Sequence, residues 1–158
     1  MTSELPSMTL KAIGIVRNGI KQALPAKDDW GKIVSDIVID STLTEALDGL
    51  EEFSHIIVLY WMHRVAATGQ VPTKVHPRGK QKLPAVGLFA TRSPHRPNPI
   101  GKVTVKLLKR QNNILKVEGL DAIDGTPVID IKPYIPGYDS VTNAEIPQWM
   151  TNLLAEHY

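Results

Sequence analysis

The sequence of 158 residues contains no cysteine. The protein therefore forms no disulfide, holds no cysteine-ligated zinc or iron–sulfur cluster, and has no thiol nucleophile. Its longest apolar run, residues 56–62, is much shorter than the roughly 20 residues that a membrane-spanning helix requires. The first ten residues also lack the basic start and apolar segment of a secretory signal. We therefore expect a cytoplasmic protein that does not associate with membranes.

Acidic residues are absent from the middle of the chain. No Asp or Glu occurs from Phe53 to Val117, although the whole sequence contains 16 acidic residues and its net charge is only +2. The same segment holds 12 of the 18 lysines and arginines. If it folds onto one face, its positive field attracts phosphate-rich partners such as nucleic acids. The alternative is a solvated basic surface without a partner.

Short apolar patterns predict a mostly β structure. They indicate strands over residues 10–16, 33–39, 56–62, 85–91, 102–107, 114–120 and 126–131. Asn112 and Asn113 are expected to form a tight hairpin turn. Strands do not alternate with helices, which disfavours a doubly wound nucleotide-binding fold. We expect a small closed or nearly closed β-barrel of about seven strands, since closure removes exposed strand edges.

A few short helices are expected beside these strands. Thr42 and Glu45 have the spacing of a capping box, which indicates a helix that begins there. Apolar residues at helical spacing predict a C-terminal helix over residues 146–157, with Ile146, Met150 and Leu153 on one stripe. The whole chain, residues 1–158, is expected to form one domain, with its core in about residues 9–140 and the C-terminal helix within 141–158.

A proline-rich loop carries the most informative polar side chains. Residues 93–99 contain three prolines and cannot form regular secondary structure. Arg92, His95, Arg96 and Asn98 are therefore held with little conformational entropy left to lose on binding. Two guanidinium groups on such a loop suit a carboxylate or a phosphate. The alternative is a rigid surface loop with incidental charge.

Two further places combine ionisable residues with strand ends. His63 and Arg64 follow the buried strand 56–62, where a barrel rim would bring them close to a ligand. The alternative is that they are strand-end charges that meet solvent. Asp130 interrupts an apolar strand, and Lys132 follows on the same face. Asp130 therefore either pairs with Lys132 or accepts hydrogen bonds from a ligand amine. Residues 124–126 are typical of a turn.

Several common catalytic motifs are missing. Neither glycine-rich phosphate loop occurs, and the five histidines show no metal-ligand spacing, so we expect no metal. Ser93 and His95 suggest a Ser/His hydrolase as an alternative. Residues two apart seldom hydrogen-bond in that way, however, and no nucleophile-elbow motif surrounds Ser93.

Two long motifs resemble one known family. They are FATRSPHRPNPIG over residues 89–101 and DGTPVIDIKPY over residues 124–134. Together with IGIVR at residues 13–17 and LEEFSH at residues 50–55, they closely resemble the TsaA-like (YaeB-like) family. The resemblance covers about residues 9–140, and its characterised members are S-adenosylmethionine-dependent tRNA methyltransferases.

The resemblance implies an activity and a cofactor. It implies a small β-barrel methyltransferase, generally a homodimer, that uses S-adenosylmethionine to methylate N6 of threonylcarbamoyl-adenosine 37 in tRNA. The implied donor contacts are His63, Arg64, Arg92, Asp124, Gly125 and Thr126. The loop at Lys27–Asp29 matches the family poorly, so no contact is assigned there. Longer bacterial members carry an additional C-terminal domain, whereas this chain ends at Tyr158, so another methylation substrate stays an alternative.

The basic segment supplies the expected contacts to RNA. Arg96 and the loop residues Lys74, Arg78, Lys80 and Lys82 are expected to bind tRNA phosphates. Asp130 or Asn98 is expected to orient the acceptor amine. A non-catalytic RNA-binding barrel is the main alternative from another functional class, because it requires only the basic face.

Overall fold

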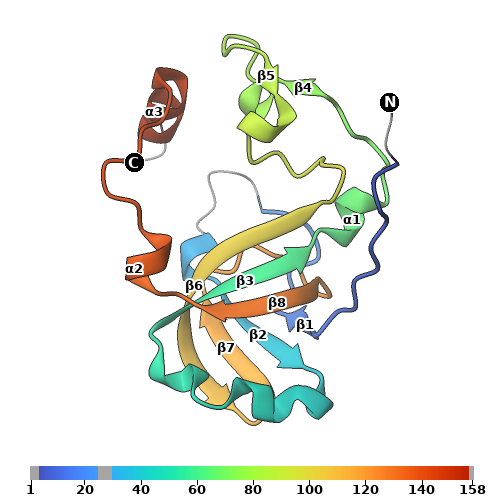
Figure 1. Ribbon diagram of the computed structural model, residues 1–158, viewed down its shortest axis with the longest axis vertical. Helices are drawn as coiled ribbons and strands as arrows, with labels where there is room; N and C mark the ends of the chain where they lie inside the picture. The colour runs from blue at the N-terminus through green and yellow to red at the C-terminus, as the bar shows by residue number, and fades with distance from the viewer. Residues whose placement is uncertain (1–3, 25–29, 157–158) are drawn as a thin grey trace.

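The computed structural model describes residues 4–24 and 30–156. Six antiparallel strands close into a barrel in the order β1-β2-β7-β6-β3-β8, and β8 pairs back onto β1 (Figure 1). The strands are β1 (Gly14–Arg17), β2 (Val34–Ile39), β3 (His55–Trp61), β6 (Ile100–Gln111), β7 (Ile114–Glu118) and β8 (Pro127–Pro133). The closed barrel that the sequence predicts is confirmed, with six strands rather than about seven.

Inward-facing side chains of the strands form the core of the barrel. Val16, Ile37, Val58, Leu115 and Val128 are completely buried, and burying such a side chain stabilises the fold by about 1.5–3 kcal/mol. In most strands their neighbours face outward, as expected from the side-chain period of two. The central strand β3 is buried on both faces over residues 56–58, which confirms its prediction as a buried strand.

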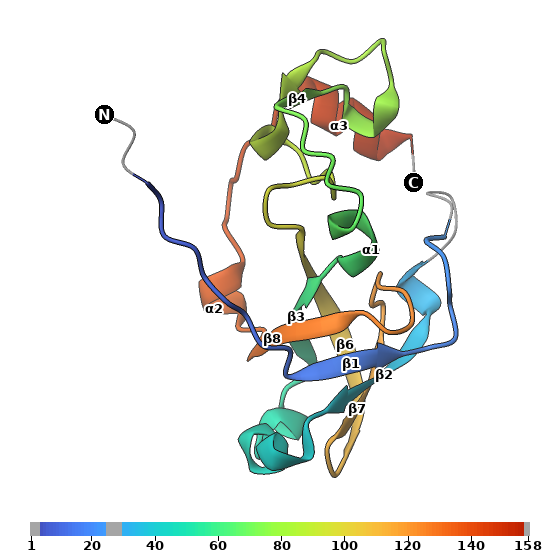
Figure 2. The same ribbon diagram turned by 90° about the vertical axis from the view of Figure 1, so that its right-hand side faces the viewer.

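Residues 68–99 form an arm outside the barrel (Figures 1 and 2). The arm contains the short strands β4 (Lys74–Val75) and β5 (Val86–Gly87) and the 3-10 helices η4 (Pro77–Gly79) and η5 (Leu88–Ala90). The strand predicted over residues 85–91 is therefore wrong beyond Gly87. The chain turns there into η5, where the Thr91 hydroxyl donates to the Leu88 carbonyl (2.7 Å). What remains of it, β5, pairs with β4 in a separate two-stranded sheet, so the barrel has one strand fewer than expected.

Two short 3-10 helices, η2 (Ser41–Leu47) and η3 (Leu50–Glu52), connect β2 to β3 at the lower end of the barrel in Figure 1. A third 3-10 helix, η1 (Trp30–Lys32), precedes β2. The prediction that Thr42 caps the first of these is wrong, because Asp40 is the capping residue. Its Oδ1 accepts from the Thr42 backbone N–H (2.9 Å) and hydroxyl (2.8 Å), two bonds that a carboxylate oxygen can accept together.

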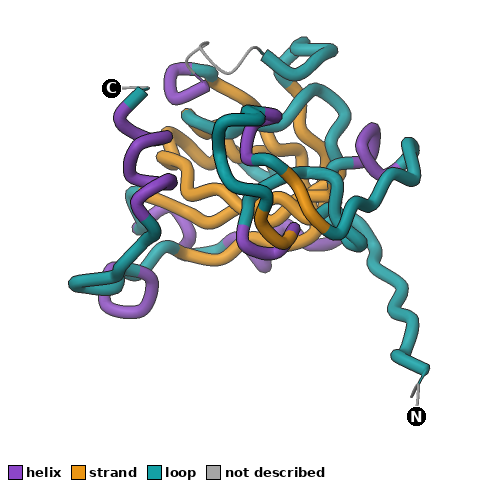
Figure 3. Tube along the Cα trace, turned by 90° about the horizontal axis from the view of Figure 1, so that it is seen from above, coloured by secondary structure: helices purple, strands orange, loops and turns teal. Residues whose placement is uncertain are grey.

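The β6–β7 hairpin and the C-terminal helix agree with the sequence patterns. Asn112 adopts a left-handed backbone (φ 54°) in the predicted turn. After α2 (Pro136–Asp139), the chain forms α3 (Gln148–Ala155), which lies against the arm (Figure 2). Within the predicted apolar stripe, Leu153 is buried but Ile146 lies before the helix and is exposed. At the other terminus, residues 4–12 run away from the barrel (Figure 3).

A close contact between β3 and β6 sets the position of Tyr60. Tyr60 and Gly101 are partners across this strand pair. A Cβ atom at position 101 would lie 2.3 Å from Cζ of Tyr60, which is too close for any side chain. Glycine at position 101 therefore lets the buried Tyr60 ring lie flat over β6.

We predict that Gly101→Ala lowers the free energy of unfolding by about 1–3 kcal/mol, the usual cost of overpacking. Urea denaturation measures this change. The control is Gly87→Ala, because a Cβ atom there meets nothing within 4 Å and the φ of Gly87 is negative. Equal losses in the two variants would contradict the proposed contact.

Candidate functional site

A pocket of about 320 Å³ opens at one end of the barrel, where β3 leads into the short helix α1 (His63–Ala66). We call it the mouth pocket. Its volume lies within the range typical of small-molecule sites. Most of its wall is apolar, with a few polar groups. It is lined by Gln22, Ala23, Tyr60, Met62, His63, Arg64, Val65, Pro94, Asp121, Ala122, Ile123 and Thr126.

Asp124 anchors the loop that borders the mouth pocket. Its Oδ1 accepts from the backbone N–H groups of Asn18 (2.9 Å) and Gly19 (3.2 Å), and its Oδ2 from Lys21 Nζ (2.9 Å). The hydrogen bond from Lys21 and the two backbone bonds hold the pKa of Asp124 well below its usual range. These bonds tie the turn at residues 124–126 to the loop that follows β1.

The two residues after Asp124 complete this turn. Gly125 has a φ of 83°, which favours glycine, and its N–H donates to the Val16 carbonyl (2.8 Å). Thr126 is 2% exposed and lines the mouth pocket, while its hydroxyl donates to the Ile123 carbonyl (2.7 Å). Of the three expected donor-binding positions in this turn, Thr126 is the one that reaches the pocket wall.

His63 and Arg64 lie together at the pocket, as the sequence predicts from their place after the buried strand. Both belong to α1, whose first turn follows β3 directly. The Arg64 guanidinium donates to the Lys21 carbonyl. The loop at residues 18–23 is therefore held from one side by Asp124 and from the other by Arg64, which leaves the His63 ring and the rest of the guanidinium beside the pocket.

Tyr60 and Asp121 form a polar pair in the pocket wall that our sequence reasoning missed. The Tyr60 hydroxyl donates to Asp121 Oδ1 at 2.7 Å. Burial and the adjacent Asp121 carboxylate raise the pKa of Tyr60 far above its usual range, so the phenol remains protonated and donates. A polar residue inside the apolar run 56–62 was the available signal, but nothing in the sequence connects it to Asp121, 61 residues away.

A second pocket, of about 540 Å³, lies between the arm and α3. We call it the arm pocket. Arg78 and Arg92 line it, together with Ser93, Trp149 and Leu153. The mouth pocket and the arm pocket share Pro94 in their walls, but Arg92 belongs only to the arm pocket. The structure therefore does not bring Arg92 together with His63 and Arg64 in one pocket of a single chain.

The basic residues of the arm divide into two groups. Lys80 Nζ forms an ion pair with the Glu156 carboxylate, and Lys82 Nζ lies 3.6 Å from the same group. These ion pairs lower the pKa of Glu156. Lys74, Arg78 and Arg92 have no ion pair or side-chain hydrogen bond within residues 4–24 and 30–156. In the predicted phosphate-binding loop, the Glu156 carboxylate therefore offsets part of the positive charge of Lys80 and Lys82.

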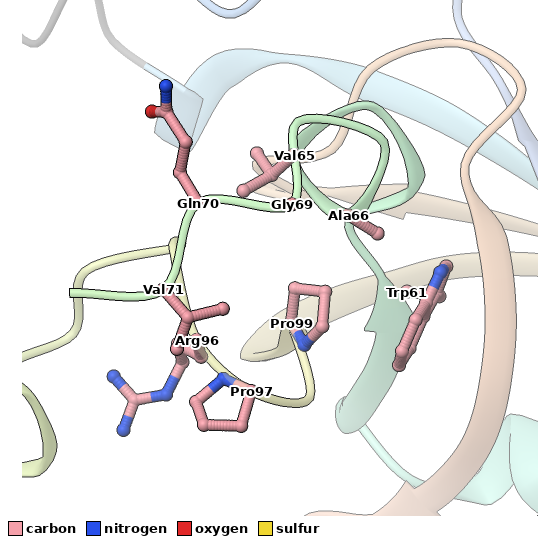
Figure 4. A pocket seen from close by; sticks show the side chains of 9 residues that line it. All are labelled: Trp61, Val65, Ala66, Gly69, Gln70, Val71, Arg96, Pro97 and Pro99. Atoms are coloured by element: carbon pink, nitrogen blue, oxygen red, sulfur yellow. The ribbon is translucent and has the colours of Figure 1, made fainter. Parts of the chain in front are cut away.

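Arg96 stabilises the proline-rich loop. Its Nη1 donates to the carbonyls of Thr91 (2.9 Å) and Ser93 (3.2 Å), and its guanidinium carbon lies 5.7 Å from the centroid of the Phe89 ring. Pro97 and Pro99 face Trp61 and α1 across a small pocket of about 200 Å³, and the Arg96 guanidinium points away from its centre (Figure 4). This arrangement rigidifies the loop, as the three prolines predict.

Asp130 and Asn98 lie apart from these pockets. Asp130 Oδ2 lies 3.2 Å from Lys132 Nζ, and Oδ1 accepts from the Ile131 N–H (2.9 Å). Of the two alternatives for Asp130, the structure contains the pair with Lys132. Asn98 is exposed, and neither residue lines the mouth pocket, the arm pocket or the pocket at Trp61. Their role in orienting an acceptor stays a prediction.

Other candidate chemistries find no support in the geometry. Within the described ranges, no three His, Cys, Asp or Glu side chains gather in a way that could hold a metal ion. Nor does any helix in these ranges combine the length and apolarity that spanning a membrane requires. Ser93 and His95 share no hydrogen bond, and the buried His95 Nδ1 has no partner among the described residues. Lys27–Asp29 lie outside the described residues.

The fold and the mouth pocket define a small β-barrel protein with a ligand-sized site at the end of the barrel where β3 leads into α1. A family model described as the tRNA-methyltransferase O N-terminal domain matches residues 20–140. The chain belongs to this family, which confirms the resemblance found in its motifs. Helix α3, which contains Trp149 and is followed directly by Glu156, lies beyond the matched residues.

Individual relatives agree with this assignment. A probable S-adenosyl-L-methionine-binding protein of Methanothermobacter thermautotrophicus is 46% identical over 134 residues, which cover 84% of this chain and 93% of that protein. The tRNA (adenine(37)-N6)-methyltransferase of Escherichia coli is 36% identical over 151 residues, 89% of this chain and 63% of that enzyme. A crystal structure of TrmO matches with a TM-score of 0.72 at 33% identity, covering 90% of this chain and 62% of that one. This chain thus spans less than two thirds of the last two proteins.

We predict that Asp124→Asn lowers the melting temperature near neutral pH. Because the folded-state pKa is depressed, the stabilisation by Asp124 is fully present above its ordinary pKa of 3.8 and is lost as pH falls through the lower folded value. The difference in melting temperature between wild type and variant should therefore shrink below about pH 4. Thermal melts of both proteins between about pH 7 and pH 3 measure this difference in melting temperature.

The control for this experiment is Asp36→Asn. Asp36 forms an exposed pair with Lys116 (2.9 Å) on the outside of the barrel. Removing such a pair usually changes stability by about 0–1 kcal/mol. A loss in Asp124→Asn no larger than in this control would show that Asp124 does not anchor the loop.

Proposed function

We propose that this protein is an S-adenosylmethionine-dependent methyltransferase that methylates N6 of adenine 37 in tRNA, with threonylcarbamoyl-adenosine as its acceptor. The observation that carries the proposal is the mouth pocket. It gathers His63, Arg64 and Thr126, three of the family's implied donor contacts, in a chain whose family match covers the barrel from residue 20 onward. Such an enzyme acts on tRNA in the cytoplasm.

The mouth pocket has groups for each part of the donor. The donor combines an adenosine, a positively charged sulfonium and an amino acid tail with a carboxylate. Apolar walls around Met62 and Ile123 suit the adenine, and the Arg64 guanidinium suits the carboxylate. The Asp121 carboxylate, oriented by the Tyr60 hydroxyl, can accept from the donor's ammonium or ribose hydroxyl groups.

The reaction itself demands little covalent help from the protein. The acceptor nitrogen attacks the methyl carbon, the carbon–sulfur bond breaks with its electron pair going to sulfur, and the nitrogen proton is released to solvent or to a nearby base. Because the sulfonium is already a good leaving group, alignment of the two substrates and exclusion of water are the main contributions. A rigid loop such as residues 93–99 and a pocket held by Asp124 suit this task.

A homodimer reconciles Arg92 with the donor site. The family resemblance implies both a homodimer and a donor contact by Arg92, yet Arg92 lines the arm pocket and does not line the mouth pocket of its own chain. Arg92 is exposed and has no ion pair within the described ranges, so it is available to a second copy. We propose that each donor site combines the mouth pocket of one subunit with Arg92 of the other.

Isothermal titration with S-adenosylmethionine tests the donor site. We predict saturable binding by the wild type and at least a tenfold loss of affinity in Arg64→Ala, equivalent to about 1.4 kcal/mol. Lys106→Ala is the control, because Lys106 is an exposed cation on β6 outside the mouth pocket. Transfer of labelled methyl to tRNA, with and without threonylcarbamoylation, then tests the acceptor. Donor binding without transfer would favour a binding module over an enzyme.

Mixing two inactive variants tests the shared site. His63→Ala and Arg92→Ala are each expected to lose methyl transfer. In a mixed dimer, one site carries both changes and the other carries neither, so an equal mixture should regain about a quarter of wild-type activity if subunits exchange randomly. If Arg92 acts on the donor of its own chain, every site in the mixture is defective and no activity returns.

A further inference from the structure

The arm pocket combines an aromatic ring with a cation in a cavity of its own. At about 540 Å³ it is larger than the mouth pocket, and most of its wall is apolar. Trp149 contributes an indole from α3, and Arg78 contributes a guanidinium from η4. An aromatic face beside a cation is the arrangement that binds single-stranded nucleic acid, because bases stack on the ring and phosphates pair with the charge.

The charges around the pocket favour a nucleotide over a neutral ligand. Arg78 lies in the segment that contains no Asp or Glu and holds 12 of the 18 basic residues. It is exposed and has no ion pair within residues 4–24 and 30–156, in contrast to Lys80, which pairs with Glu156. Arg78 therefore offers its full charge at the pocket, and a phosphate is the complementary group.

Helix α3 is fixed in a position that keeps the indole at the pocket. Leu153 is 5% exposed, although it lies outside the barrel core, and it is buried where α3 meets the arm. The ion pairs of Glu156 with Lys80 and Lys82 fasten the end of the same helix. Trp149 is thus presented from a helix with both an apolar and an electrostatic attachment, which limits the ordering cost of binding.

We propose that the arm pocket holds one nucleotide of the RNA substrate, with its base stacked on Trp149 and its phosphate on Arg78. This inference rests on the proposed function and names how the RNA is held. The pocket shares Pro94 with the mouth pocket, so a nucleotide bound there lies next to the donor site of the same chain. The stacking residue lies outside the family-matched residues, so α3 adds this contact to the barrel domain.

Binding of a fluorescein-labelled single-stranded hexaadenylate RNA, followed by anisotropy, tests the stacking. Trp149→Leu keeps an apolar side chain against the arm but removes the ring, and we expect it to weaken binding at least about fivefold, the lower limit for one stacked base. Trp149→Phe keeps a ring and should recover most of the affinity. If Trp149→Leu binds the RNA as tightly as wild type, the proposal is wrong.

A single-tryptophan variant reports on Trp149 directly, with the Trp149 ring itself unchanged. Trp30→Phe combined with Trp61→Phe leaves Trp149 as the one indole, since the chain has three. Hexaadenylate should quench its fluorescence over the same concentrations at which anisotropy reports binding. RNA that binds without quenching would place the base elsewhere and overturn the proposal.

The phosphate contact is tested by comparing two cations of the same acid-free segment. Arg78→Ala should weaken RNA binding and reduce the slope of log affinity against log salt by about one. Lys109→Ala removes the same charge from the exposed face of β6, outside the arm pocket, and should change affinity less than about twofold. Equal effects of both substitutions would show a diffuse field and contradict a phosphate site at Arg78.

Donor binding separates this proposal from the proposed function. Trp149→Leu should bind S-adenosylmethionine like the wild type in isothermal titration, because Trp149 does not line the mouth pocket. If wild type fails to bind the donor but still binds RNA through Trp149, the methyltransferase proposal fails and the nucleotide site stands. If wild type binds the donor and Trp149→Leu binds RNA as tightly as wild type, the nucleotide site is wrong and the methyltransferase proposal stands.

Discussion

Pairing of the short strand β1 with both β2 and β8 is the interaction on which the barrel and its mouth depend. β1 has only four residues, yet Ile13 and Val16 donate backbone hydrogen bonds to β8 and to Thr126 at 2.8 and 3.0 Å. A Cβ atom at Gly14 would lie 2.6 Å from the Val38 carbonyl, so glycine permits the close approach of β1 and β2. Without this closure, β2 and β8 would be exposed edges.

The same junction positions the candidate site. The chain leaves β1 into the loop at residues 18–23, and Asp124, in the turn that precedes β8, binds two backbone N–H groups of that loop. Arg64, in the helix α1 that follows the central strand, donates to the Lys21 carbonyl of the same loop. The contacts that close the barrel therefore lie next to the contacts that form the pocket, in a chain of 158 residues with one main core.

The arm and α3 form a second pocket outside the barrel. Residues 68–99 lie outside the barrel and present the basic groups, while α3 covers part of them and adds Trp149. Glu156 offsets one of the two positive charges of Lys80 and Lys82, so the net charge that RNA would meet there is lower than the count of lysines suggests. A nucleotide site between arm and helix then lies beside, but separate from, the donor site, with Pro94 in the wall of each.

Local sequence patterns predicted an element correctly where side-chain period or backbone preference alone decides the local structure. The alternation in β6, the turn at Asn112 and the buried strand β3 follow from side-chain period and backbone preference, which are local properties. The pattern failed at residues 88–91, because a hydrogen bond from Thr91 to Leu88 ended the strand. Their place after the buried strand and the family resemblance indicated His63 and Arg64, and the resemblance indicated Thr126; all three line one pocket.

The sequence by itself determined that this protein is a closed β-barrel with a basic middle segment and a rigid proline-rich loop. Only the tertiary structure decided which charges are neutralised and which pocket each polar group enters. Tyr60 meets Asp121 across 61 positions, and Lys80 meets Glu156 across 76. Such pairs depend on how distant segments approach one another. A local pattern cannot encode that approach, because each side chain alone has the same propensity with or without its partner.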